Sequence, residues 1–171
     1  MNVCLIPSRY QSKRFPGKAL AAIDGIPMIQ RVYDRVKTAR GVDYVGVATD
    51  DDRIFALINE LDGNVILTDP DLPTGTDRIA AAADAMALGP SDIVVNIQGD
   101  QPYICAGHIE QVIELLSADP GVVMATLAFP IMDVREAYDR NTVKVVMGDD
   151  GSAVYFSRAP IPNRRNGNQV E

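Results

Sequence analysis

The sequence lacks the features that would place it in a membrane or in the secretory pathway. No apolar run approaches the roughly 20 residues that a membrane-spanning helix needs. The chain opens with MNVCLIPSRY, which is apolar for only about six residues and has no basic stretch before it. This pattern predicts a first β-strand in place of a signal peptide, and we expect no association with membranes.

Histidine and cysteine are scarce, which bears on catalytic and metal chemistry. His108 is the only histidine, and nothing in the sequence is placed to join it in a zinc site or a Ser–His–Asp triad. Cys4 and Cys105 share no metal-ligand or redox spacing, and their apolar neighbours predict reduced, buried thiols. Reduced thiols and the missing leader together predict a cytoplasmic location.

Two glycine-rich signatures of nucleotide binding are also missing. The loop after the first predicted strand contains neither G-x-x-x-x-G-K-[ST] nor G-x-G-x-x-G. Their absence disfavours a P-loop protein, a dinucleotide-dependent dehydrogenase and a methyltransferase. The chain has no internal repeat and no linker, so its length predicts a single domain spanning residues 1–171.

The distribution of charge is more informative than its total. The net charge of −7 argues against a general nucleic-acid-binding protein. Residues 1–40 nevertheless carry a net charge of +6, and the remainder carries −13, as an anionic small ligand bound at one end would require. An amphipathic helix over 28–40 with a basic outer face explains four of the cations. It leaves four others unexplained: Arg9, Lys13, Arg14 and Lys18.

Apolar, β-branched runs alternate with helical stretches along the chain. Strands are predicted over 2–7, 44–48, 64–67, 92–97, 122–129, 142–147 and 153–157, and helices over 28–39, 51–61, 76–87, 106–117 and 133–138. The early strands are apolar on both faces, as in a parallel sheet covered by helices. The alternation predicts an α/β fold, a three-layer α/β/α sandwich with right-handed crossovers. Asp149-Asp150-Gly151 predicts a late hairpin, which would make the sheet mixed and mostly parallel.

Three unusual loops follow predicted strands, where ligands bind in doubly wound sheets. The first is PSRYQSKRFPGK, residues 7–18, whose cations and backbone N–H groups suit a triphosphate. Phe15-Pro16-Gly17 predicts a rigid turn that directs a lysine at the end of the loop, and a solvated basic loop is the alternative. The candidate phosphate-binding residues are Ser8, Arg9, Ser12, Lys13, Arg14 and Lys18.

The second loop is TGTDRIA, residues 74–80, which precedes a predicted helix. Gly75 would let the backbone approach a base or ribose closely, and Arg78 would reach a phosphate or a carboxylate. The alternative is a helix N-cap at Thr76 or Asp77, with surface charges beside it.

The third loop is NIQGDQP, residues 96–102, which follows a very hydrophobic strand. Asp100 is suited to bind Mg²⁺, which in phosphate chemistry uses one or two carboxylates together with substrate oxygens. An ordinary turn aspartate is the alternative. For Asp50-Asp51-Asp52, the sequence favours capping of a helix N-terminus over metal binding.

Together these strings resemble the 3-deoxy-manno-octulosonate cytidylyltransferase family. Six motifs carry the resemblance in order: IPSRYQSKRFPGKAL at 6–20, GIPMIQRVYDR at 25–35, VATDDDRI at 47–54, TGTDRIA at 74–80, NIQGDQP at 96–102, and TVKVVM with YFSRAPIP within 142–162. The resemblance implies a nucleotide-diphospho-sugar transferase fold (Rossmann-like) and the transfer of CMP from CTP to a 3-deoxy-manno-octulosonic acid, with pyrophosphate released. It further implies Mg²⁺ as cofactor, a role in lipopolysaccharide or capsule synthesis, and a homodimer in the full-length form.

The resemblance also implies roles for individual residues. Positions that match triphosphate-binding residues are Arg9, Ser12, Arg14 and Lys18, and positions near the cytidine and sugar are Leu67, Thr74, Gly75, Arg78 and Gln98. Asp100 matches a metal-binding aspartate, so the catalytic candidates are Arg14, Lys18 and Asp100. Sugar-binding candidates are Arg78, Arg158 and Arg165, although the late cluster with Arg164 could also be a basic, loosely attached C-terminus.

Two positions depart from the family pattern. Gln101 stands where glutamate is usual and Leu72 where histidine is common, which points toward a modified octulosonate. The resemblance also implies that a C-terminal part, with dimer contacts, much of the sugar site and a second metal-binding aspartate, is missing. Besides an active enzyme, the alternatives are a catalytically inactive CTP-binding module and a nucleotidyltransferase that acts on another acid sugar.

Overall fold

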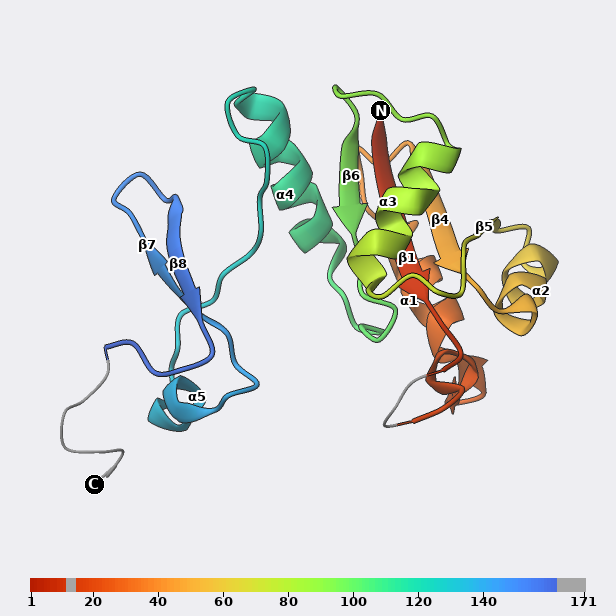
Figure 1. Cartoon of the computed structure of the whole chain (residues 1–171), viewed down its shortest axis with the longest axis horizontal. Coiled ribbons are helices and arrows are strands. Elements are labelled where there is room, and N and C mark those ends of the chain that lie inside the picture. Colours follow the sequence, from red (N-terminus) through yellow and green to blue (C-terminus); the bar gives the residue numbers. More distant parts are fainter. Residues whose placement is uncertain (12–14, 163–171) are drawn as a thin grey trace. The chain divides into compact units, whose positions relative to one another are not determined.

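The computed structural model describes residues 1–11 and 15–162, and Figure 1 shows their helices and strands. The chain divides into two compact units, the first covering Met1–Ala125 and the second beginning at Thr126. No helix in the described residues is long and apolar enough to cross a membrane. The expectation of a single domain over 1–171 stays a prediction.

The first unit is built on a parallel sheet of four strands in the order β5-β4-β1-β6. Its strands are β1 (Asn2–Ser8), β4 (Tyr44–Thr49), β5 (Asn64–Leu67) and β6 (Ile93–Asn96). β1 lies inside the sheet, with Ser8 beside Thr49 of β4 and Leu5 beside Asn96 of β6. The carboxyl ends of these strands therefore meet at one edge, and all four were predicted from the sequence.

Helices cover both faces of this sheet, which confirms the predicted three-layer arrangement. They are α1 (Met28–Val36), α2 (Asp52–Glu60), α3 (Gly75–Ala85) and α4 (Ala106–Ala118), with a short 3₁₀ helix at Lys18–Leu20. In Figure 1, α3 crosses in front of β1 and α1 lies behind it. The core clusters agree, because α3 packs in one cluster and α1, α2 and α4 contribute to the other.

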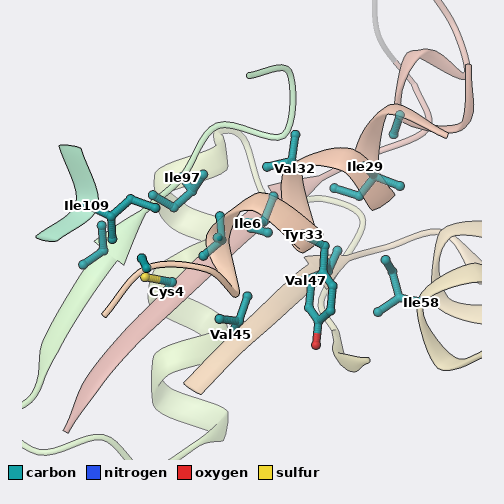
Figure 2. Packing of buried hydrophobic residues seen from close by; sticks show 14 of the residues in the cluster. Cys4, Ile6, Ile29, Val32, Tyr33, Val45, Val47, Ile58, Ile97 and Ile109 are labelled. Carbon is teal, nitrogen blue, oxygen red and sulfur yellow. The ribbon is translucent and has the colours of Figure 1, made fainter. Parts of the chain in front are cut away.

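The alternation of side chains along β1 produces these two cores. Cys4 and Ile6 point into the larger cluster, and Val3 and Leu5 point into the smaller one, and all four are fully buried. Figure 2 shows Cys4 and Ile6 among isoleucine and valine side chains of the larger cluster. Burying a valine, leucine or isoleucine side chain stabilises the fold by about 1.5–3 kcal/mol, so β1 is a major source of stability.

Helix capping follows the sequence at α2 and differs in detail at α3. The Asp51 carboxylate accepts hydrogen bonds from the backbone N–H groups of Arg53 (3.0 Å) and Ile54 (3.4 Å), which confirms the predicted capping. At α3 the N-cap is Thr74, earlier than predicted, and Asp77 completes a capping box with it. Neither Thr76 nor Asp77 is the N-cap, because α3 begins at Gly75.

A short hairpin between the 3₁₀ helix and α1 was not predicted. Its strands are β2 (Ala22–Ile23) and β3 (Ile26–Pro27), and they pair antiparallel. Asp24 and Gly25 connect them with φ values of 48° and 77°. Asp-Gly is a typical dipeptide of such tight hairpin turns, so the signal was present in the sequence.

The second unit contains the predicted short helix and late hairpin. These are α5 (Val134–Tyr138) and the antiparallel pair β7 (Lys144–Met147) and β8 (Ala153–Ser157). The pair forms a sheet of its own within the described residues, separate from the parallel sheet. Lys144 is buried, and its ammonium donates hydrogen bonds of 2.7–2.9 Å to three carbonyl groups of the same unit.

Two expectations about local structure were wrong. No strand forms over 122–129, where the side chains of Val123 and Met124 are 94% and 81% exposed. An apolar, β-branched run becomes a strand only when another strand pairs with it, and in the described part of the chain this segment has no such neighbour. Cys105 is exposed, so the expectation of a buried thiol was wrong. This residue is the N-cap of α4 and lies outside the core.

The two thiols should therefore differ strongly in reactivity. Burial raises the pKa of the Cys4 thiol to about 12, whereas Cys105 is exposed to solvent. Since the thiolate is the reactive form, we expect iodoacetamide to alkylate Cys105 quickly and Cys4 only after unfolding. Timed alkylation followed by mass spectrometry measures this, and Cys105→Ser should remove the fast phase. Rapid alkylation of Cys4 in the folded protein would contradict the packing of β1.

Candidate functional site

A cavity of about 470 Å³ lies at the carboxyl ends of β1 and β6. This volume lies within the range of about 300–1,000 Å³ that small-molecule sites occupy. All three loops singled out in the sequence contribute to it. The predicted site residues that line it are Ser8, Arg9, Lys18, Thr74, Gly75, Arg78, Gln98 and Asp100.

The loops converge because two glycines allow close approach to Pro7, near the end of β1. A Cβ atom on Gly75 would lie 3.3 Å from Cγ of Pro7, and one on Gly99 would lie 3.1 Å from its carbonyl oxygen. Both distances are shorter than most Cβ contacts, so a larger side chain would push α3 or the loop after β6 away from β1. Gly75 therefore allows α3 to pack against Pro7, and it also lines the cavity.

The N-terminus of α3 forms part of the cavity wall. Thr74 and Gly75 line the cavity, and the capping box holds the first turn through a hydrogen bond of 3.2 Å from the Asp77 N–H to the Thr74 hydroxyl. Backbone N–H groups and the positive end of the helix dipole favour an anion at such a helix start. This end of α3 therefore brings backbone N–H donors to the cavity that Arg9 and Lys18 also line.

Lys18 and Asp100 form an ion pair within the cavity, with 2.7 Å between Nζ and Oδ2. Gly17 precedes the lysine in a left-handed conformation with φ of 73°, as a turn that directs Lys18 requires. The side chains are 37% and 51% exposed, and exposed ion pairs contribute only about 0–1 kcal/mol. A phosphate or a cation could therefore separate this pair at little cost.

Arg78 is held by protein groups although it borders the cavity. It is 2% exposed, and its Nη2 donates to the Asp50 carboxylate at 2.8 Å. Its Nη1 donates to the hydroxyl of Thr68, so α3 is tied to the ends of β4 and β5. Asp50 is therefore the counter-ion of a buried arginine, a role that the sequence interpretation missed.

Gln98 reaches the cavity from the turn that follows β6. Its side-chain amide nitrogen donates to Oδ1 of Asn96 at 2.9 Å, which orients the side chain. The backbone N–H of Gln101 donates to the Gln98 carbonyl at 3.2 Å and closes the turn. This turn places Gly99 against β1 and Asp100 against Lys18.

Other predicted site residues lie elsewhere. Leu67 ends β5 with 56% exposure and is not part of the cavity wall. Arg158 belongs to the second unit, where its Nη1 donates to the carbonyl of Arg140 at 3.0 Å. Four predicted residues lie outside the described residues: Ser12, Lys13, Arg14 and Arg165.

The basic residues around α1 have structural contacts. Arg31 donates to the carbonyl of Ile23, and Arg40 pairs with Glu110 of α4 at 2.9 Å. Lys37 lies 5.4 Å from the centre of the Tyr33 ring. These cations therefore match the amphipathic-helix interpretation. Of the basic residues within 1–40 that the structure describes, Arg9 and Lys18 line the cavity.

Several residues that line the cavity were not proposed from the sequence as site residues. They are Pro7, Phe15, Ala19, Met28 and Gly99. The signal available for them was their position in or beside the quoted motifs, because apolar side chains carry no chemical signature of a site. Their presence adds apolar surface to a cavity wall that also carries charged groups.

The described residues could bind a divalent cation only together with ligand atoms from a bound phosphate. No cluster of three or more His, Cys, Asp or Glu side chains occurs among them that could hold a metal by itself. Asp100 supplies one carboxylate in the cavity. Mg²⁺ at phosphate sites is typically held by one or two carboxylates together with phosphate oxygens and water, so the site suits an ion that arrives with a phosphorylated ligand.

Comparison with known proteins identifies the family. The model of the family described as "Cytidylyltransferase" matches residues 3–170. The chain belongs to the cytidylyltransferase family. The chain is 52% identical over 162 residues to the 3-deoxy-manno-octulosonate cytidylyltransferase of Desulfosudis oleivorans, covering 95% of this chain and 65% of that protein. It is 51% identical over 165 residues to the 8-amino-3,8-dideoxy-manno-octulosonate cytidylyltransferase of Shewanella frigidimarina, and the match covers 96% of this chain and 67% of that protein.

A solved structure supports the same assignment. The CMP:2-keto-3-deoxy-manno-octonic acid synthetase complexed with CTP superimposes with a TM-score of 0.82 and is 40% identical. The match covers 96% of this chain and 67% of that protein. The chain thus spans about two thirds of the length of the relatives it matches. The expected α/β nucleotidyltransferase fold is confirmed.

The ion pair between Arg78 and Asp50 should stabilise the fold as a unit. We expect Arg78→Met to lower the free energy of unfolding by about 3 kcal/mol, because it leaves Asp50 unpaired in a largely buried position. Adding Asp50→Asn should recover part of this loss. Urea denaturation measures both, with Arg35→Met on the exposed face of α1 as control. Losses that simply add in the double variant would contradict a coupled pair.

Proposed function

We propose that this chain binds CTP in the cavity and transfers CMP to 3-deoxy-manno-octulosonic acid or its 8-amino analogue. One observation carries the proposal: three loops line a single cavity in a member of the cytidylyltransferase family. The first loop supplies cations, the second supplies a helix N-terminus, and the third supplies a carboxylate. The similar proteins are named for these two sugars, and a similar structure holds CTP. We propose the same ligands for the present site.

The charges in the cavity suit the triphosphate. In the proposed complex Arg9, Lys18 and the start of α3 face the phosphates, with Arg14 and the other predicted residues of the basic loop completing the set. The 2-hydroxyl of the sugar attacks the α-phosphorus in line, the bond to the β-phosphate breaks, and pyrophosphate leaves. Such a reaction depends on positioning and on neutralising the charge of the leaving group, which arginine and lysine side chains provide.

Asp100 is the proposed magnesium ligand in this site. When bound with the nucleotide, Mg²⁺ would neutralise phosphate charge and lower the pKa of the attacking hydroxyl. The pairing with Lys18 supports the assignment, because the carboxylate already lies beside a proposed phosphate-binding cation. On nucleotide binding, Lys18 would turn to the phosphates and leave the carboxylate for the metal.

The sugar site is proposed from the sequence and the names of the relatives. Arg78, Arg158 and Arg165 are the proposed sugar-binding residues, and the Arg78 guanidinium would act from its fixed place at the cavity wall. Gln101 and Leu72 are the positions proposed to favour the amino sugar. Leu67 is the remaining proposed contact near the cytidine.

The cellular setting is proposed on the same basis. We place the protein in the cytoplasm, in lipopolysaccharide or capsule synthesis, with a homodimer in the full-length form and no nucleic-acid partner. We also propose that 1–171 belongs to one nucleotidyltransferase domain. The similarity along nearly the whole chain supports this, because a single family model covers residues 3–170.

Pyrophosphate release tests the proposed reaction. With CTP, Mg²⁺ and either octulosonic acid, we expect turnover that falls about 100-fold or more in Lys18→Met and in Asp100→Asn. Lys18→Met removes a positive charge proposed to stabilise the transition state, and Asp100→Asn removes the carboxylate proposed to hold Mg²⁺. Arg35→Met, which removes an exposed cation of α1, should behave like the unchanged protein.

Calorimetry with CTP separates the alternatives. CTP binding without turnover would favour an inactive binding module, and turnover of Asp100→Asn at the normal rate would refute the role given to the carboxylate.

A further inference from the structure

Arg53 has an unusual set of contacts outside the cavity. It lies in the first turn of α2, and its guanidinium carbon is 3.3 Å from the centre of the Tyr10 ring. The same group donates two hydrogen bonds to Asp51, from Nε to Oδ1 at 3.0 Å and from Nη2 to Oδ2 at 2.6 Å. The arginine is thus fixed between an aromatic face and a carboxylate, and it does not line the cavity.

Tyr10 is hydrogen-bonded to Gly17 across the basic loop, residues 7–18. The backbone N–H of Gly17 donates to its carbonyl oxygen at 2.8 Å. A Cβ atom on Gly17 would lie 3.0 Å from the Tyr10 ring, so glycine is needed for contact with the ring as well as for its φ of 73°. Arg9 and Lys18, which line the cavity, are the immediate neighbours of this closure on either side.

We propose that Arg53 is a positioning residue for triphosphate binding: it anchors the Tyr10 ring and so holds the base of the basic loop, with Arg9 and Lys18, at the cavity. The inference rests on the proposed CTP site. Asp51 is a firm support for the arginine because it also caps α2. A chain of contacts therefore runs from the helix cap through Arg53 and Tyr10 to Gly17.

The chemistry of this position requires an arginine. A guanidinium group is planar, so it can stack on an aromatic ring and bind a carboxylate through two parallel hydrogen bonds at once. Lysine would keep the positive charge and lose the second hydrogen bond. The hydrogen bonds to Asp51 raise the pKa of Arg53, and those from Arg53 hold the pKa of the Asp51 carboxyl below its usual value, as a stable pair would require.

The second unit contains a matched control. Asp133 caps α5 and pairs with Arg135, which has the same spacing as Asp51 and Arg53 and a similar Nε to Oδ1 distance of 3.1 Å. Neither Asp133 nor Arg135 lines the cavity. Arg135→Ala therefore removes the same kind of pair at a helix N-cap without touching Tyr10.

Calorimetric titration with CTP is the central test. We expect Arg53→Ala to raise the dissociation constant about five-fold, the size of effect that an exposed cation–π contact can supply. Tyr10→Leu should have the same effect and Tyr10→Phe, which keeps the ring, a much smaller one. Arg53→Lys should fall between Arg53→Ala and the unchanged protein, and Arg135→Ala should bind CTP normally.

Hydrogen exchange of the Gly17 amide gives a second readout that needs no nucleotide. Its exchange should speed up in Arg53→Ala and Tyr10→Leu and stay unchanged in Arg135→Ala. If the unchanged protein binds CTP and Arg53→Ala binds it equally well, the positioning role is wrong. If the unchanged protein does not bind CTP, the proposed function fails. In that case, unchanged Gly17 exchange in Arg53→Ala would also refute the anchoring, and faster exchange would support it.

Discussion

The burial of β1 on both faces is the constraint on which the first unit depends. Its side chains alternate between two hydrophobic cores, so helices must cover both sides of the sheet. The neighbouring strands run parallel to it, which brings their carboxyl ends to one edge. At that edge Pro7 is approached by Gly75 and Gly99, and the cavity lies where these segments meet. The geometry of the site thus follows from packing around one strand.

The two ion pairs at the cavity have different physical characters. Arg78 and Asp50 are largely buried, and their contact ties α3 to the strand ends. Lys18 and Asp100 are partly exposed, and separating them costs little. The first pair suits a fixed wall, and the second suits groups that exchange partners when a charged ligand arrives. Arg53 extends the fixed part, because it supports the basic loop from the side of α2.

The sequence predicted the layers and most elements because hydrophobic periodicity reflects burial directly. It did not predict which groups would pair. Arg78 was expected to face a ligand, and only the arrangement of three elements revealed Asp50 as its partner. The predicted strand over 122–129 does not form, because strand formation depends on a neighbouring strand, which local sequence does not encode. The Asp24-Gly25 hairpin was missed even though its turn signal was present. Predictions for Ser12, Lys13, Arg14 and Arg165 concern positions outside the described residues.

Nuclear magnetic resonance can map directly whether CTP binds in the cavity at the carboxyl ends of β1 and β6. Backbone amide shifts would be followed while CTP and Mg²⁺ are added to the isotope-labelled protein. We expect the largest changes at the cavity, in Ser8, Arg9, Gly75, Gln98 and Gly99. The opposite edge of the sheet provides a contrast, because Tyr33, Tyr44 and Asn64 line a hollow of about 220 Å³ there. Changes concentrated at that hollow, or none at the cavity under saturating CTP, would show that CTP does not bind in the cavity.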